Sequence, residues 1–323
     1  MTARVAVVVA TRDRAAFLPE LVAALAAQTR APDEVVVVDD GSSDETPEVL
    51  TRLRERGGLP LTTLRHESPQ GPSAARAAGV AATTSEVLAF TDDDCVPEPG
   101  WLAALAAAAE TADLVQGRTR PAEASAVGPW DRTIWVDTPT GLYETCNLAV
   151  RRAAFDGVGG FPRLSLLAEG RGGRGFGEDA ALGAAIVGAG GRVAWAADAV
   201  VAHRWLPGRY ADHLSGRWRM RAFPGLARVA PQSPPPFLGV FHTRRTAAVD
   251  LAVVGVAVAA VLRHPLPLLG VLPWLRTSWP TARAKARGRR RGALVRLAQL
   301  AVSDVVGLSA LVVGSARHRR LRL

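Results

Sequence analysis

Residues 34–43, EVVVVDDGSS, place two aspartates, a glycine and two serines directly after a run of four valines. Successive β-branched residues with no polar alternation are typical of a strand that is covered on both faces. The pattern returns at residues 86–94, EVLAFTDDD, where an apolar run again ends in adjacent aspartates. These two stretches therefore predict two buried strands that carry carboxylates at their carboxyl ends.

Strand-like and helix-like patterns alternate through the first 120 residues. We expect strands over Arg4–Ala10, Glu34–Val38, Leu61–Arg65, Glu86–Thr91 and Asp113–Gly117. Helices are expected over Ala15–Gln28, Gly71–Ala82 and Trp101–Glu110, and over a segment that Thr46-Pro47 caps and Gly57-Gly58 ends. Residues 145–150 and 192–196 are two further expected strands, with a helix over 179–187 between them. This order predicts an α/β fold with a doubly wound, mostly parallel sheet, whose ligands bind beyond the carboxyl ends of the strands.

The composition indicates a globular protein of a reducing compartment. With 48 % hydrophobic and 21 % charged residues, the chain can bury a sizeable core, which excludes global disorder and collagen-like architecture. Two cysteines, Cys95 and Cys146, are too few for a disulfide framework or a thiolate zinc site. The apolar run near the start is too short for a signal peptide, so we expect the catalytic part to stay in the cytoplasm.

The net charge of +9 is divided unevenly along the chain. Residues 1–204 hold 19 basic and 27 acidic residues, a net charge of −8, whereas residues 205–323 hold 20 and 3, a net charge of +17. A basic tail on an acidic domain suggests contact with a membrane or with nucleic acid. We expect a catalytic domain over 1–204, an amphipathic interfacial segment and linker over 205–245, and hydrophobic and basic membrane-associated helices over 246–323.

Three apolar stretches follow residue 246: Ala247–Leu262, Leu266–Leu275 and Ala293–Val313. The first spans only about 24 Å as a helix, short of the roughly 30 Å hydrocarbon core. Crossing there would also carry a basic loop to the far side of the membrane, against the positive-inside tendency. The third stretch contains Asp304, at a cost of about 3 kcal/mol on insertion scales. In-plane or re-entrant helices are therefore predicted, with a two-span topology and a water-soluble helical pair as alternatives.

The two acidic clusters, Asp39-Asp40 and Asp92-Asp93-Asp94, fall where the predicted fold places its ligands. Adjacent carboxylates repel one another unless a cation neutralises them, and hard oxygen ligands suit Mg²⁺ or Mn²⁺. Either cluster alone is equally well read as ordinary turn and cap aspartates. Together, at the ends of two strands of one sheet, they predict a metal and anion site.

At this point the sequence resembles a known family, the GT-A glycosyltransferases of family 2. The resemblance rests on VAVVVATRDRAAFLPEL, VVVVDDGSSDET, GPSAARAAGVA, EVLAFTDDDCVPEPGWL, TCNLAVRRAAFDGVGGF and GFGEDAALGAAI, and extends to about His203. It implies the GT-A nucleotide-diphospho-sugar transferase fold. It also implies transfer of a sugar from a nucleotide-sugar donor with inversion at the anomeric carbon, assisted by a divalent metal.

The resemblance assigns donor-binding roles near the strand ends. Thr11, Asp13 and Asp40 would line the nucleoside pocket, with Asp40 accepting from the base, whereas Asp39 would be structural. Arg76 would approach the diphosphate, although a solvated helix arginine is an equally good interpretation of that residue. These roles, together with those of Asp92 and Asp93, make up the predicted donor site.

The resemblance places the metal at a DxD motif. Asp92 and Asp94 match its two acids, and Asp93 would face the sugar or support its neighbours. His203 follows a strand-like run and matches a position where relatives often have a metal- or diphosphate-contacting histidine, although a structural role is the alternative. A cation there would stabilise the departing diphosphate.

An inverting transfer also needs a base that takes the proton of the acceptor hydroxyl. Asp179, with Glu178 second, matches the family's catalytic acidic position; the alternative is a simple cap residue. The N-terminus of a helix would hold this carboxylate ionised. The preceding glycine-rich loop, Gly170–Gly177, is expected to close over the donor.

Two further positions are interpreted more weakly. Asn147 lies in a family-like strand on the expected acceptor side. Arg217-Trp218 resembles the end of the QxxRW motif of processive synthases, but Leu214 replaces the glutamine, which argues against a processive polymer synthase.

The sequence thus predicts a metal-dependent enzyme on the cytoplasmic face of a membrane. Its donor would be a UDP-sugar, and its acceptor a glycan, a lipid-linked group or another cell-envelope hydroxyl. The alternatives are a GT-A-like nucleotidyltransferase, a degenerate relative and a basic nucleic-acid-binding protein. The last is disfavoured because the basic residues flank apolar stretches while the α/β part is acidic.

Overall fold

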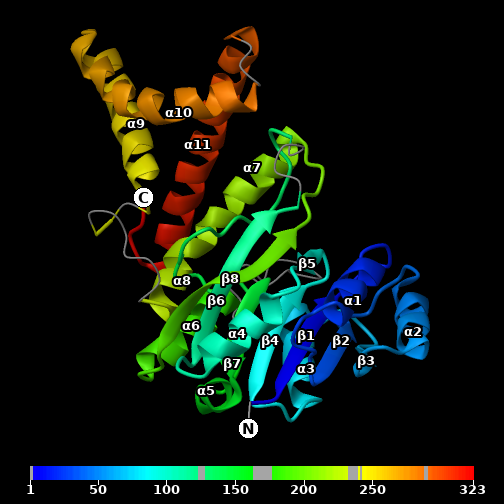
Figure 1. Cartoon of the computed structure of the whole chain (residues 1–323). Helices are drawn as coiled ribbons and strands as arrows, with labels where there is room; N and C mark the ends of the chain where they lie inside the picture. The colour runs from blue at the N-terminus through cyan, green and yellow to red at the C-terminus, as the bar shows by residue number, and fades with distance from the viewer. Residues whose placement is uncertain (1–2, 123–127, 163–176, 232–238, 241, 287–289) are drawn as a thin grey trace. The chain divides into compact units, whose positions relative to one another are not determined.

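An eight-stranded mixed sheet in the order β3-β2-β1-β4-β7-β6-β8-β5 organises the α/β part of the chain (Figure 1). The strands are β1 (Val5–Thr11), β2 (Glu34–Asp39), β3 (Leu61–Arg65), β4 (Val87–Asp92), β5 (Cys95–Pro97), β6 (Leu114–Pro121), β7 (Asn147–Arg151) and β8 (Val193–His203). The pairs β1/β2, β1/β4, β2/β3 and β6/β8 are parallel, and β7 runs antiparallel between β4 and β6. The predicted fold class is confirmed.

The computed structural model describes residues 3–122, 128–162, 177–231, 239–240, 242–286 and 290–323. These residues divide into two compact units. The α/β unit comprises the described residues of Met1–Ala126 and Thr133–Trp205, and the helical unit those of Val127–Arg132, Leu206–Pro231 and Pro235–Leu323. Residues 128–132, which fall inside the range predicted for the catalytic domain, therefore pack with the helical unit.

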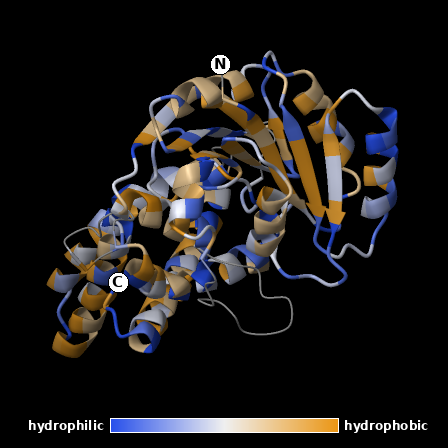
Figure 2. Cartoon of the chain, turned by 90° about the horizontal axis from the view of Figure 1, so that it is seen from below, coloured by the Kyte–Doolittle hydropathy of each residue, from blue (hydrophilic) through white to orange (hydrophobic). Residues whose placement is uncertain are grey.

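Helices cover both faces of the sheet, as the uninterrupted apolar strands predict. They are α1 (Leu18–Ala26), α2 (Thr46–Arg56), α3 (Pro72–Ala81), α4 (Trp101–Ala109), α5 (Arg152–Gly157) and α6 (Glu178–Gly188). Val7 of β1 belongs to a buried cluster with α1, α2 and α4, whereas its neighbour Val8 belongs to a cluster with α3, α5 and α6. Both pleat faces are therefore buried, and the central strands are hydrophobic along most of their length (Figure 2).

Several predicted bounds are wrong in informative ways. Thr46 is the first residue of α2 and not its cap, which is Glu45. The short strand β5 was not predicted, because three residues give no periodicity. β8 joins the expected strand at 192–196 and the strand-like run before His203 into one strand, with a register shift against β6 between them.

Asn147 fills the gap that this register shift leaves. Its Nδ2 donates to the carbonyls of Arg118 and Ala199, both at 2.8 Å, and its Oδ1 accepts from Trp101 Nε1 at 2.9 Å. A Cβ on Gly117 would lie 2.2 Å from Asn147 Oδ1, so the amide occupies the space that this glycine leaves. Asn147 is fully buried, so its interpretation as an acceptor-side residue is wrong: it joins three elements of the sheet layer.

The helical unit contains α7 (Tyr210–Trp218), η1 (Arg219–Ala222), α8 (Phe223–Val229), α9 (Arg244–Leu262), η2 (Leu266–Val271), α10 (Leu272–Lys285) and α11 (Arg290–His318). The predicted interfacial segment thus forms α7, η1 and α8, while the expected linker at 234–236 lies outside the described residues. Among the described residues, α9 and α11 are long and apolar enough to cross a membrane, with mean hydropathies of 1.9 and 1.8.

Four helices of this unit meet at Asp304 of α11, which is only 4 % exposed. Its carboxylate accepts from Arg217 Nη2 of α7 at 3.2 Å, from Arg245 Nη2 of α9 at 2.8 Å and from Trp274 Nε1 of α10 at 2.8 Å. The predicted cost of inserting this helix into a membrane assumed that Asp304 carries an isolated charge. In the structure that charge is paired with two arginines inside the protein. Arg217, which matches the arginine of the QxxRW motif, is thus one of the partners of Asp304.

Trp130 anchors residues 128–132 in the helical unit. Its ring lies 4.9 Å from Tyr210 and 4.7 Å from His213, centroid to centroid, and it packs with Ala282 and Leu300. Lys285 Nζ lies 4.8 Å from the ring centroid and donates to the carbonyl of Pro129. This aromatic and cation–π cluster explains why the segment belongs to the helical unit although the residues on both sides of it belong to the α/β unit.

Candidate active site

The predicted donor and metal residues lie at a single edge of the sheet, where parallel strands end together. Thr11 pairs with Asp39 across β1 and β2, and Ala10 pairs with Asp92 across β1 and β4. β8 contributes His203, which pairs with Cys95 of β5. Residues from distant parts of the α/β unit are thereby brought within reach of one ligand.

Asp40 orders the loop that leads into α3. Its Oδ1 accepts from the amide of Gln70 at 2.8 Å and lies 2.7 Å from His66 Nδ1, and its Oδ2 accepts from the amide of Gly71 at 2.8 Å. Burial alone would raise the pKa of Asp40, but these hydrogen bonds outweigh it and lower the pKa. A carboxylate oxygen with one such bond keeps capacity for another, so the predicted contact to a nucleobase is compatible with this geometry.

Thr11 and Asp13 each connect the end of β1 to a neighbouring loop. The buried Thr11 hydroxyl donates to Asp93 Oδ2 at 2.7 Å. Asp13 takes a left-handed conformation at φ 53°, and its Oδ1 accepts from the amide of Ser43 at 2.7 Å. The bonds to Ser43, opposed by burial, lower the pKa of Asp13. Asp13 itself is exposed beside the DDGSS loop, in keeping with its predicted place in the nucleoside pocket.

The acidic cluster after β4 carries more negative charge than its surroundings neutralise. Burial, with the adjacent Asp94, raises the pKa of Asp93 to about 7. Burial and the nearby Asp92 also raise the pKa of Asp94, against the effect of His203. A bound cation would relieve this repulsion, so the cluster fits a divalent metal.

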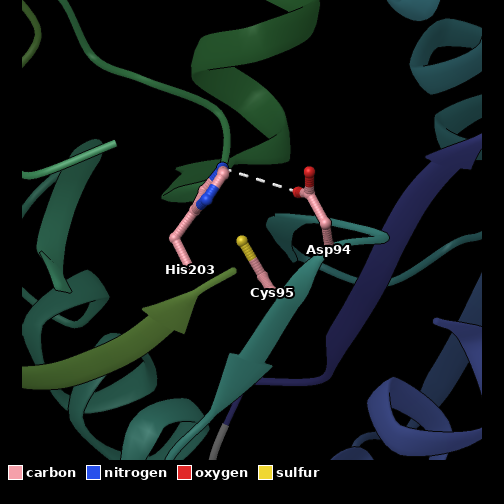
Figure 3. Close-up of side chains that lie close together, drawn as sticks. All are labelled: Asp94, Cys95 and His203. Atoms are coloured by element: carbon pink, nitrogen blue, oxygen red, sulfur yellow. Dashed lines mark ion pairs between the residues drawn. The ribbon is translucent and has the colours of Figure 1, made fainter. Parts of the chain in front are cut away.

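His203 and Asp94 face one another with 3.5 Å between Nε2 and Oδ1, and Cys95 lies beside them (Figure 3). The ligand atoms of all three residues lie within 4.8 Å of one another. Burial raises the pKa of the Cys95 thiol well above its usual value, and the residue belongs to the apolar core. Oxygen and imidazole donors from Asp94 and His203 suit Mn²⁺, whereas a protonated thiol does not add a ligand.

Arg76 connects the metal cluster to the predicted base. Its Nη2 donates to Asp92 Oδ1 at 2.6 Å, and its charge acts on Asp179 as well. The side chain is 7 % exposed, so the alternative of a solvated helix arginine is wrong. Among the described residues Arg76 Nε has no hydrogen-bond partner, which leaves it a donor for an incoming anion.

Asp179 lies in the first turn of α6, after Gly177 at φ 82°. Its Oδ2 accepts from both the amide and the hydroxyl of Thr145, each at 3.0 Å. Glu178, the second predicted base, is buried beside it. The glycine loop predicted to close over the donor lies, up to residue 176, outside the described residues.

The net shift in the pKa of Asp179 is upward, whereas the N-terminus of a helix alone would lower it. Burial raises the pKa of Asp179, and the opposing effects of Arg76 and Thr145 do not cancel that rise. A carboxylate with a raised pKa binds a proton more tightly, which makes it a stronger general base.

Two residues beside Asp179 were missed by sequence reasoning. Thr145 holds the carboxylate in place, and Glu144 adds a half-buried acid whose pKa is raised by desolvation. The hydroxyl of Thr140 donates to both carboxylate oxygens of Glu144, at 3.2 and 2.9 Å. Their position just before the family-like Cys146-Asn147 is a local signal, but contact with Asp179, 34 residues away, is visible only in the fold.

Comparisons with known proteins agree with this arrangement. The structure of the mannosyltransferase PcManGT of Pyrobaculum calidifontis, solved with GDP-Man and Mn²⁺, covers 97 % of this chain and 87 % of that one, with a TM-score of 0.61 and 22 % identity. The structure of residues 1–349 of Staphylococcus aureus TarS, solved with UDP-GlcNAc, covers 98 % and 92 %, with a TM-score of 0.52 and 20 % identity. The fold is that of the GT-A glycosyltransferases.

Within that class, the α/β unit contains a glycosyltransferase family 2 domain. The family model described as Glycosyl transferase family 2 matches residues 6–161. An uncharacterized glycosyltransferase of Nostoc sp. is 34 % identical over 112 residues. That match covers 35 % of this chain and 34 % of the relative, so the chain spans about a third of the relative's length.

Proposed function

We propose that this enzyme moves a sugar, with inversion, from a UDP-sugar to a hydroxyl of a lipid-linked or cell-envelope acceptor. One observation carries the proposal: Arg76 touches Asp92 of the metal cluster and acts electrostatically on Asp179. The buried guanidinium of Arg76 therefore connects the acidic cluster that would hold the leaving diphosphate with the carboxylate that would act as general base. That is the pairing that a displacement at a sugar carbon needs.

Asp92, Asp94 and His203 would hold Mn²⁺ or Mg²⁺, which supplies positive charge to the leaving diphosphate. Thr11, Asp13 and Asp40 would bind the nucleoside, and Asp93 would face the sugar. Arg76 would donate to the diphosphate through its unpartnered Nε. In this arrangement the α/β unit orients the donor before the acceptor arrives.

Asp179 would take the proton of the acceptor hydroxyl at its Oδ1, because Thr145 occupies Oδ2. Its partly buried position raises its basicity and excludes competing water. Glu178 is the second candidate for this role.

We infer that the enzyme works on the cytoplasmic face of a membrane, where a lipid-linked acceptor is available. The apolar helices α9 and α11 and the basic charge of residues 205–323 support this placement. A nucleic-acid partner is not proposed, because the α/β unit that carries the site is acidic.

The test is a panel of UDP- and GDP-sugars, incubated with the full chain and detergent-extracted membrane lipid. Release of nucleoside diphosphate is measured with Mn²⁺, with Mg²⁺ and with chelator, and Asp94→Ala is the control. We expect metal-dependent release from one UDP-sugar. Release of inorganic diphosphate would instead indicate a nucleotidyltransferase, and full activity in chelator would overturn the metal assignment.

A further inference from the structure

Within the helical unit, α9 and η2 form a tightly packed pair. A Cβ on Gly255 would lie 2.5 Å from the carbonyl oxygen of Pro267, and one on Gly270 would lie 2.9 Å from that of Leu251. The two backbones therefore approach closely at both glycines, and Arg263, at φ 49°, begins the turn between them. This pair, residues 251–271, is called the apolar hairpin below.

The outer surface of the apolar hairpin is hydrophobic. Val254 is 56 % exposed and Val261 is 81 % exposed. Further exposed side chains of the hairpin are those of Leu251, Val253, Val256, Val258, Leu262, Leu266, Leu268 and Leu269. A continuous apolar surface of this kind is rare on a soluble monomer and marks a contact with an apolar partner.

Charged residues lie at the ends of the hairpin. Between residues 246 and 275 the charged side chains are Asp250 and Arg263, with His264 beside the latter. Arg244 lies at the start of α9, and Arg276 follows the hairpin in α10. Apart from Asp250, which adjoins its first residue, the surface is apolar along its length, with Arg263 at its turn and Arg244 and Arg276 beyond its base. This pattern fits the interface of an anionic bilayer, with acyl chains beneath and lipid phosphates beside the arginines.

The dimensions favour a flat arrangement over insertion by the tip. Although α9 as a whole is long enough for a span, its exposed apolar part from Leu251 to Leu262 is only about 18 Å long, short of the roughly 30 Å hydrocarbon core. Tip-first insertion would bring Arg263 close to the middle of the bilayer, at a cost of about 3 kcal/mol on insertion scales. Lying flat leaves Arg263 level with the headgroups.

We propose that the apolar hairpin lies flat in one leaflet of an anionic lipid bilayer and attaches the enzyme there. This inference deepens the membrane placement given under the proposed function, and it is tested without donor or acceptor. Failure of sugar transfer would therefore leave its result unaffected.

The first test is sedimentation of the full chain with phosphatidylcholine vesicles, with and without phosphatidylglycerol. Val254→Glu and Val261→Glu should each lower the partition constant by about tenfold or more, because a carboxylate is placed against acyl chains. Val193→Glu, at a valine of β8 that is 46 % exposed, is the control outside the hairpin and should bind like the parent. Unchanged binding by both hairpin variants would overturn the proposal. A stable dimer that fails to bind vesicles and that Val254→Glu dissociates would also overturn it.

The second test uses His264→Cys, which leaves the charge of Arg263 in place; Cys95 and Cys146 are buried and should not react. An impermeant maleimide added outside preformed, protein-coated vesicles should label the new thiol as fast as it does in detergent. Protection from the reagent would overturn the flat arrangement and indicate insertion of the tip.

Discussion

Thr145 donates its amide and its hydroxyl to the same oxygen of Asp179, Oδ2, at 3.0 Å each. Both bonds favour the ionised carboxylate, while burial favours the protonated form. Asp179 is thus kept between two opposing effects, and the direction of its pKa shift depends on the balance between them.

Thr145→Val should upset that balance. The variant keeps the shape of the side chain but loses the hydroxyl bond, so the pKa of Asp179 should rise further. Because only the ionised form accepts a proton, the acid limb of the kcat profile should move to higher pH. Turnover near neutral pH should fall about tenfold, the effect of one hydrogen bond to a charged group. Thr145→Ser should restore the parent profile; an unshifted profile in the valine variant would remove Thr145 from this role.

Asp179→Asn should separate chemistry from donor binding. Loss of the base should lower kcat by about 10² to 10⁴-fold, while nucleotide affinity stays near that of the parent because Asp179 acts on the acceptor. Nucleotide titration by calorimetry and turnover by nucleoside-diphosphate release measure the two quantities. If donor affinity falls together with turnover, Asp179 is not the base.

Asp94→Ala should reduce both turnover and nucleotide binding. Without this carboxylate, His203 loses its partner at 3.5 Å, and we expect turnover to be abolished and nucleotide binding in Mn²⁺ to weaken at least about tenfold. Binding measured with chelator present should differ little between variant and parent. Equal binding of both proteins in Mn²⁺ would mean that Asp94 does not hold the metal.

Asp304→Asn should destabilise the helical unit and leave the α/β unit folded. Removing one member of a buried ion cluster typically costs about 3 kcal/mol, because the remaining charges, here those of Arg217 and Arg245, lose their partner. Limited proteolysis should accelerate after residue 206 and remain slow within the α/β unit. As a control, Asp212→Asn removes a carboxylate that caps only α7, and it should have a smaller effect. Equal protease resistance of the Asp304 variant and the parent would contradict this role of the cluster.

The parts of the fold that were predictable are those with local patterns. Valine runs and strand-end aspartates identify β1, β2 and β4, because burial on both faces leaves a continuous apolar signal. Family-like motifs gave the candidate metal and base positions. The continuity of β8 was not predictable, since its two strand-like segments are joined through a register shift that Asn147 accommodates from another strand.

Most of the other features that the sequence did not predict are ion pairs between residues far apart in the chain. Asp304 was read as an isolated charge in an apolar helix, but Arg217 and Arg245 reach it from 87 and 59 residues away. Arg76 was assigned no partner by its sequence, yet Asp92 is its ion-pair partner. Such contacts follow from tertiary packing and leave no periodic trace in the chain.

Lys285, which covers one face of Trp130, is the single lysine among 323 residues. Its Nζ is consequently the only side-chain amine in the chain, and burial, with the nearby Arg296, lowers its pKa and so favours the reactive neutral form. Reductive methylation with ¹³C-formaldehyde would introduce one labelled side chain. Its methyl resonance should be shifted upfield by the indole ring current for as long as Trp130 stays in place. Besides the methylated α-amine of the N-terminus, this side chain gives an NMR reporter of whether residues 128–132 remain docked in the helical unit.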